Sequence, residues 1–259
     1  MKSELVQKAY EIAKERYAAM GVDTEKVLEQ MQDFHLSLHC WQADDVKGFE
    51  VQAGELTGGI QATGNYPGAA RNIDELRADI VKAKSYIPGT HRLNLHEIYG
   101  DFKGKVVDRD EVTPEYFESW IEWAKENNMK LDFNSTSFSH PKSGNLSLAN
   151  PDEGIRNFWI EHTKRCREIS EAMGKAQGDP CIMNLWVHDG SKDQTVNKYL
   201  YRSLLKDSLD KIFATKYDNM KDCIESKVFG IGLESFTVGS NDFYTAYAAQ
   251  NNKLITLDT

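Results

Sequence analysis

Short runs of alternating apolar and polar residues recur along the chain, separated by longer stretches with helical periodicity. Residues 34–41 (FHLSLHCW) alternate strictly, as expected for a strand with one buried face. Further strands are predicted at 92–98, 130–138, 181–187, 228–235 and 253–259. Helices are predicted at 3–20, 24–32, 72–87, from 113 onward, 150–174, 195–216 and 241–250. This alternation predicts a parallel sheet within one α/β domain that spans residues 1–259.

Residues that favour helix starts precede several of the predicted helices. Asn72 is followed by Glu75 at the reciprocal capping position, Pro114 falls at a first helical position, and Asn241 is placed as the cap of the short helix at 241–250. In contrast, residues 54–71 are rich in glycine and have no periodicity. We therefore predict a mobile loop or lid there.

Polar side chains occupy one face of almost every predicted strand. This polar set comprises His35, Ser37, His39, Arg92, Asn94, His96, Asp132, Asn134, Thr136, Asn184 and His188. A strand buried on both faces is normally apolar on both. Burying polar groups without partners would cost about 1–3 kcal/mol each. We interpret the polar set as the lining of a ligand site, with a purely structural hydrogen-bond network as the alternative.

Two carboxylates lie near the ends of the last two predicted strands. Glu234 ends the strand at 228–235, and Asp258 ends the strand at 253–259. In a parallel α/β barrel, catalytic groups gather at the carboxyl ends of the strands. Two such carboxylates suit a hard divalent cation, although each alone is more often a structural group bonded to backbone donors.

Aromatic and histidine side chains provide further candidates for the same site. Trp41 and Trp186 lie at predicted strand ends, where sugar rings often stack on aromatic side chains, and both also fit an ordinary core. His96 shares the polar face of its strand, although a lone interior histidine is more often structural. We assign His140 to a loop and His162 to a helix surface, with no functional role.

The composition excludes several classes of protein. The chain has a formal charge of −9 and no basic run, which argues against binding nucleic acid. No apolar run reaches the roughly 20 residues of a membrane span, and the charged N-terminal region does not resemble a signal peptide. The four cysteines form no CxxC pair, so reduced thiols and a cytoplasmic location are predicted.

Several longer runs resemble L-rhamnose isomerases, and the resemblance extends from residue 1 to residue 259. These runs are GGIQATGNYPG (58–68), RLNLHEIY (92–99), LDFN (131–134), FSHP (138–141), ESKVFGIGLES (225–235), VGSNDFY (238–244) and LDT (257–259). The resemblance implies a (β/α)8 TIM barrel related to xylose isomerase and an interconversion of L-rhamnose and L-rhamnulose by hydride shift. It also implies two divalent cations, usually Mn²⁺ with Mg²⁺, Co²⁺ or Zn²⁺ as alternatives, and a cytoplasmic homotetramer.

The resemblance also implies roles for individual residues. Glu234 and Asp258 match metal ligands, while Trp41, His96 and Trp186 match substrate-pocket positions. Tyr66 belongs to the run that covers the pocket, and His96 is the candidate for assisting ring opening. Xylose-isomerase-like barrels often have a lysine two residues after the metal-binding glutamate. Here that position is Phe236, so a lysine-assisted mechanism is not expected.

The chain supplies about six strand–helix units, whereas a closed barrel needs eight. In the family, the LDT run continues into a segment with a metal-binding histidine, which does not follow here. We therefore expect the first part of such an enzyme, with little activity on its own. A catalytically inactive fragment and a xylose-isomerase-like metal hydrolase are the alternatives, and the acidic charge argues against a hydrolase that acts on nucleic acid.

Overall fold

The computed structural model describes residues 3–39, 48–50, 70–227 and 235–258. Its six main strands are β1 (Ser37–His39), β2 (Arg92–His96), β3 (Lys130–Asn134), β4 (Cys181–Trp186), β6 (Met220–Glu225) and β8 (Leu254–Thr256). Its helices are α1 (Ser3–Ala19), α2 (Thr24–Met31), α3 (Ile73–Lys84), α4 (Glu118–Glu126), α5 (Glu153–Gln177), α6 (Lys198–Ile212) and α7 (Asn241–Asn251). Short 3₁₀ turns cover Glu97–Tyr99 and Pro114–Phe117.

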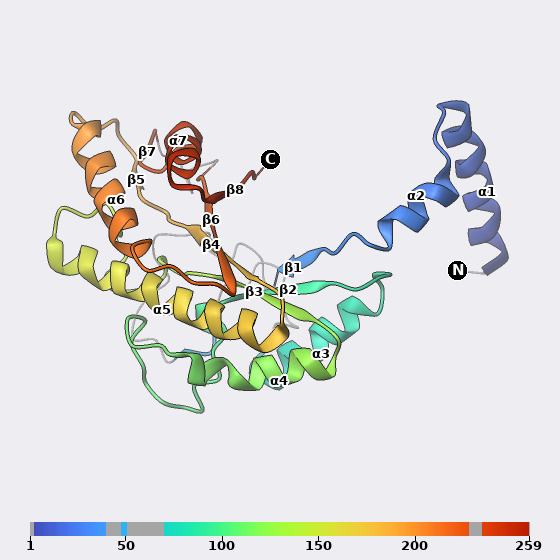
Figure 1. Cartoon of the computed structure of the whole chain (residues 1–259), viewed down its shortest axis with the longest axis horizontal. Coiled ribbons are helices and arrows are strands. Elements are labelled where there is room, and N and C mark those ends of the chain that lie inside the picture. Colours follow the sequence, from blue (N-terminus) through green and yellow to red (C-terminus); the bar gives the residue numbers. More distant parts are fainter. Residues whose placement is uncertain (1–2, 40–47, 51–69, 228–234, 259) are drawn as a thin grey trace.

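The six strands form one parallel sheet in the order β1-β2-β3-β4-β6-β8. The sheet is curled, and helices α3 to α6 cover its outer side (Figure 1). Two further strands, β5 (Gly190–Ser191) and β7 (Phe236–Thr237), form a small antiparallel pair beyond the carboxyl ends of the main strands. This arrangement confirms the predicted fold class, because the six-stranded sheet is consistent with part of a (β/α)8 barrel.

The outer face of the sheet carries the hydrophobic core. Leu93 and Leu95 of β2 are fully buried, as are Phe133 of β3 and Leu185 of β4. Helix α5 packs against β3, β4 and β6, and its Trp159 is also fully buried. Since side chains alternate across a strand, this apolar outer face leaves the other parity for the concave inner face.

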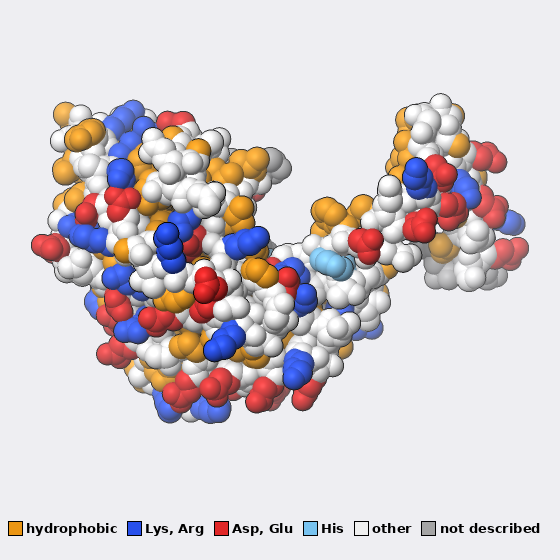
Figure 2. All heavy atoms as spheres, in the orientation of Figure 1, with side chains coloured by type: hydrophobic (Ala, Val, Ile, Leu, Met, Phe, Trp, Pro, Cys, Tyr) orange, Lys and Arg blue, Asp and Glu red, His pale blue; other side chains and the backbone are white. Residues whose placement is uncertain are grey.

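The first two helices lie apart from the body of the protein. Helices α1 and α2 contact each other and project as an arm joined to the body by a narrow connection (Figure 1, Figure 2). Neither helix has a buried residue, and apolar side chains such as Leu5, Ile12 and Leu28 are exposed. Among the described residues, no helix combines the length and apolar character needed to cross a membrane.

Side-chain caps mark the starts of several helices. The side chain of Asn72 accepts a hydrogen bond from the backbone N–H of Glu75 at 2.9 Å, and Asp152 caps α5 through the N–H of Ile155. The cap predicted at Asn241 is wrong by one residue, because Asn241 is already helical and Ser240 holds the cap position.

One strand was missed by the hydrophobic pattern. Strand β6, at Met220–Glu225, follows α6 in a segment for which the pattern predicted no strand. Residues 228–234 of the predicted strand, including Glu234, lie outside the described residues. Strand β6 has a charged residue, Asp222, on its outer parity between Met220 and Ile224. Because this carboxylate is paired with Arg167 and Lys253, the strand tolerates it where the pattern requires an apolar residue.

Candidate functional site

Four aromatic and imidazole rings form an arc at the carboxyl ends of the first four strands. His39 ends β1, His96 ends β2, Phe138 follows β3, and Trp186 ends β4. The rings of His39 and His96 stack with centroids 5.0 Å apart. Phe138 meets His96 edge to face at 6.3 Å and meets Trp186 in the same way at 5.8 Å. His96 and Trp186 therefore both pack against the ring of Phe138.

Both histidines of the arc favour the neutral form. His96 is only 5% exposed, and its burial, with smaller contributions from His39 and the Arg109 guanidinium, lowers its pKa well below the usual 6.5. Desolvation also lowers the pKa of His39 to about 4, although part of this residue remains exposed. A neutral imidazole both donates and accepts one hydrogen bond, which suits proton transfer at a hydroxyl group.

Polar side chains form a layer on the concave face just below the arc. The Asn134 amide donates to Asn94 Oδ1 at 2.6 Å. The Asn184 amide donates to a carboxylate oxygen of Glu225, and Asn184 Oδ1 accepts from the Thr256 hydroxyl at 2.9 Å. Burial raises the pKa of Glu225, as does the charge of Asp258, while the bond from Asn184 opposes both. The polar inner face predicted from the sequence is therefore present.

Asp258 lies beyond the end of β8 at the rim of the sheet. It is exposed and, together with Lys227, Arg202 and Asp242, lines a cavity of about 640 Å³. Within residues 3–39, 48–50, 70–227 and 235–258, no three His, Cys, Asp or Glu side chains come together closely enough to bind a metal ion. The described residues therefore supply one rim carboxylate toward a cation and do not complete a ligand set.

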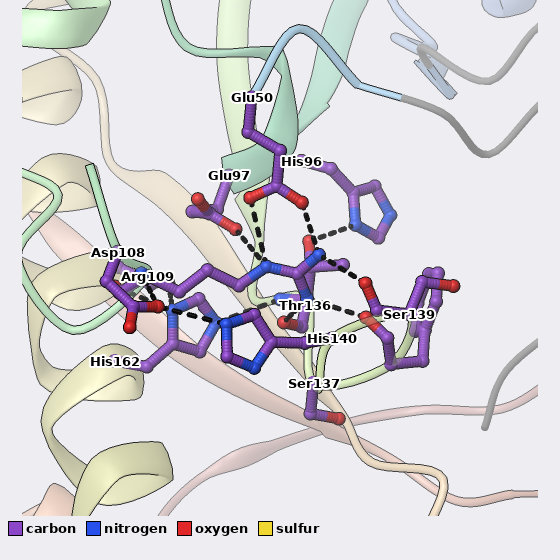
Figure 3. Close-up of polar contacts among 12 residues, drawn as sticks. Glu50, His96, Glu97, Asp108, Arg109, Thr136, Ser137, Ser139, His140 and His162 are labelled. Atoms are coloured by element: carbon purple, nitrogen blue, oxygen red, sulfur yellow. Dashed lines mark hydrogen bonds and ion pairs between the residues drawn. The ribbon is translucent and has the colours of Figure 1, made fainter. Parts of the chain in front are cut away.

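A buried arginine, Arg109, bonds to the segment that follows β3 (Figure 3). Arg109 is 1% exposed, and its guanidinium donates to the backbone oxygens of Thr136, Phe138 and Ser139 at 2.7, 2.6 and 3.2 Å. It also forms an ion pair with Glu50, whose Oε2 lies 3.1 Å from Arg109 Nε. These bonds engage the donors of the guanidinium and fix the segment that follows β3.

A second carboxyl group, that of Glu97, faces the same guanidinium. Glu97 is fully buried, and its Oε2 lies 3.6 Å from Arg109 Nε, beyond hydrogen-bond distance. Neither oxygen has a hydrogen-bond partner among the described residues. Burial and the nearby Glu50 raise the pKa of Glu97 well above its usual 4.5, while Arg109 opposes them. The surroundings of Glu97 therefore favour its neutral form relative to an exposed carboxyl group.

The surface position predicted for His162 is wrong. His162 is fully buried on α5, where its Nε2 accepts from the Thr136 N–H at 3.1 Å. Its other nitrogen, Nδ1, therefore carries the proton and donates to the Arg109 backbone oxygen at 3.1 Å. His140 lies in a loop as predicted, and its Nε2 contacts Asp108 at 3.0 Å. The sequence around His162 is charged, so nothing local indicated that these two distant backbone groups would bury it.

The predicted site residues thus fall into two groups. His96 and Trp186 belong to the arc, and Asp258 lies at the rim. Trp41, Tyr66 and Glu234 lie outside the described residues, as do residues 54–69 of the loop predicted at 54–71. The sequence analysis did not select Phe138, Glu225 or Arg109 for the site. The position of Phe138 shortly after β3, in the run FSHP, was a usable signal for the first of these.

Comparisons with known proteins match this chain to one family. A family model described as L-rhamnose isomerase (RhaA) matches residues 4–259. An L-rhamnose isomerase from Bacteroides thetaiotaomicron is 83% identical over 258 residues, which cover all of this chain and 62% of the relative. L-rhamnose isomerases from Rhodopirellula baltica and Mannheimia succiniciproducens are 52% and 54% identical, and the matches cover 60% and 61% of their lengths. The chain thus spans less than two thirds of the length of these relatives.

Proposed function

The chain belongs to the L-rhamnose isomerase family, and from this premise we propose that it contributes the sugar-binding wall of an enzyme that interconverts L-rhamnose and L-rhamnulose. The observation that carries the proposal is the arc of His96, Phe138 and Trp186 above a layer of inward-facing amides. The arc lies at the carboxyl ends of parallel strands, where barrel enzymes bind their substrates.

The two surfaces of this site suit the two surfaces of a deoxy sugar. The phenyl ring of Phe138 and the indole of Trp186 offer apolar faces to the C–H bonds and the methyl group of the substrate. Asn94, Asn134 and Asn184 offer donors and acceptors to its hydroxyl groups. A few placed polar groups on a largely apolar wall are typical of small-molecule sites.

The reaction requires proton transfers that the described residues can support. Opening of the pyranose ring removes a proton from the anomeric hydroxyl and places one on the ring oxygen. We assign this transfer to His96, whose imidazole is neutral and whose Nδ1 lies 3.0 Å from Thr136 Oγ1. In the open chain, a hydride moves from C2 to C1 while a proton moves from O2 to O1, so the aldose and ketose are isomers with no net oxidation.

We also propose a divalent cation, Mn²⁺ by preference, at Asp258 and Glu234. When bound, such an ion would act as a Lewis acid on the two sugar oxygens. A carboxylate at the rim is a suitable donor for Mn²⁺. A cytoplasmic homotetramer is proposed from the family resemblance alone, and light scattering coupled to size-exclusion chromatography tests the assembly.

The test of the function is an assay of the complete gene product that carries this chain, with L-rhamnose and Mn²⁺. Formation of a ketose is expected, and His96→Gln should reduce kcat/KM by about 10²-fold or more, as for loss of a general acid–base group. Absence of ketose, with or without added cations, would overturn the proposal. Titration with duplex DNA distinguishes the isomerase from a hydrolase that acts on nucleic acid, because an isomerase should show no saturable binding of DNA.

A further inference from the structure

The hydrogen bonds of Arg109 end on the backbone of the residues that hold the rings of the arc. We propose that Arg109 is a positioning residue for the sugar-binding wall, acting through Thr136 and Phe138. The inference uses the proposed function only for its kinetic readout. The Arg109 guanidinium donates to the backbone oxygens of Thr136, Phe138 and Ser139. It therefore fixes the backbone conformation of the segment after β3.

Thr136 links Arg109 to His96. All three polar groups of Thr136 are engaged: its N–H donates to His162, its backbone oxygen accepts from Arg109, and its hydroxyl contacts His96 Nδ1 at 3.0 Å (Figure 3). The hydroxyl can therefore shift only if the bonds to Arg109 and His162 change. Because the contact engages one ring nitrogen, it sets the orientation of His96.

Arg109 also fixes the position of Phe138. Its backbone oxygen accepts from Arg109 at 2.6 Å, while its ring lies between His96 and Trp186. A shift of this backbone would move the ring that joins the two predicted substrate contacts. Small displacements of positioned groups reduce catalytic efficiency by as much as about 10²-fold.

Position 109 requires arginine rather than lysine. Lysine has three donors on one nitrogen and cannot reproduce the planar fork that reaches three carbonyl oxygens and a carboxylate. The carboxylate is supplied by Glu50, whose neighbour Phe49 donates from its N–H to the Ile98 oxygen at 2.7 Å. A β-carbon at Gly48 would collide with Ile98, so this short segment lies directly against the end of β2. Arg109 therefore joins the segment 48–50, the end of β2 and the segment after β3.

The test compares Arg109→Lys with Arg167→Lys in the complete gene product. Arg167 is a matched control because it is also 1% exposed, pairs with Asp222 and donates to the backbone oxygens of Ile212 and Thr215, away from the arc. The first readout is the imidazole NMR signal of His96, assigned by its loss in His96→Gln. The second is the KM for L-rhamnose, measured at a temperature where each variant is fully folded.

We expect Arg109→Lys to shift the His96 signal and to raise KM by about tenfold, while Arg167→Lys leaves both unchanged. Unchanged His96 signals in Arg109→Lys, or equal effects of the two variants, would overturn the inference. If wild-type protein does not convert L-rhamnose, the proposed function fails, and the His96 signal alone decides the inference.

A second pair of variants covers the case in which Arg109→Lys does not fold. Thr136→Val removes the hydroxyl but keeps the backbone groups that Arg109 and His162 bind, so the fold should persist. The His96 signal should move in Thr136→Val and return toward its wild-type position in Thr136→Ser. If the His96 signal is the same in Thr136→Val as in wild type, the proposed link from Arg109 to His96 does not exist.

Discussion

The imidazole rings of His39 and His96 stack with their centroids 5.0 Å and their planes 28° apart, joining the ends of β1 and β2. Desolvation lowers the pKa of each, to about 4 for His39 and well below 6.5 for His96. Two positively charged rings at this distance would repel each other. The stack is therefore a feature of the neutral forms, and acid should weaken it.

The stacked pair predicts a loss of stability on the acid side. In the unfolded chain a histidine takes up a proton near pH 6.5, whereas in the folded protein it does so only at lower pH. The unfolded state then binds more protons, so the free energy of unfolding falls as pH drops from 6.5 toward 4. His39→Phe keeps a ring for stacking and removes the proton site. Urea unfolding at pH 7 and pH 5 should show a smaller decrease for this variant than for wild type, and an equal decrease would contradict the prediction.

Glu97 predicts the opposite dependence on pH. Its folded-state pKa is raised above the usual 4.5 by burial, so the folded state keeps a proton that the unfolded chain releases. This contribution to stability is complete below pH 4.5 and is lost as the pH rises through the folded-state pKa. Glu97→Gln removes the titration while keeping the shape. We expect it to raise the free energy of unfolding at pH 8 by about 1–2 kcal/mol relative to wild type and to change it little at pH 4.5.

Glu97→Ala separates this charge effect from packing. It also removes the acid but leaves a cavity, so it should destabilise the protein at both pH values by about 2 kcal/mol or more. If both variants destabilised the protein equally at pH 8, the carboxyl group itself would stabilise the fold at that pH, and the prediction drawn from its raised pKa would be wrong.

Much of the fold could be predicted because its determinants are local. Leu93 and Leu95 alternate with polar neighbours, and this period alone places the buried face of β2. The same alternation indicated that Asn94, Asn134 and Asn184 face inward, and each of these amides takes part in a side-chain hydrogen bond. The fold class and the polar interior could both be predicted because they follow from this local alternation.

The missed features depend on partners far away in the sequence. Strand β6 was missed because Asp222 breaks its apolar pattern. The charges that balance Asp222 are Arg167 on α5 and Lys253 just before β8. His162 is buried by bonds to Thr136 and Arg109, which lie 26 and 53 residues away. Periodicity reports which face a residue occupies only when its burial follows from its own polarity.

Trp186 should contribute directly to sugar binding. It ends β4 and meets Phe138 edge to face, so replacing it with alanine removes one side of the apolar wall. Loss of a packed aromatic contact of about 1.5–3 kcal/mol corresponds to a roughly 10- to 150-fold rise in the dissociation constant for L-rhamnose. Calorimetric titration with L-rhamnose measures this dissociation constant. Trp123→Phe is the control, since Trp123 is a half-buried tryptophan on α4 that packs on Trp120 instead. Equal affinity in Trp186→Ala and wild type would remove Trp186 from the site.

Asp258 should bind the cation that we propose, and a nearby acid provides a matched control. Asp258 and Asp242 line the same cavity of about 640 Å³, so each contributes the same charge to its surroundings. If Asp258 is a direct ligand, Asp258→Asn should weaken Mn²⁺ binding by about tenfold or more, because even residues outside the ligand set cost that much when changed. Asp242→Asn lowers the negative charge equally but should leave the affinity nearly unchanged, since Asp242 pairs with Ser240 and Arg202 at the start of α7. Electron paramagnetic resonance of Mn²⁺ added to protein freed of metal by chelation measures both. Equal weakening by the two variants would mean that only general negative charge attracts the ion, and the assignment of Asp258 as a ligand would be wrong.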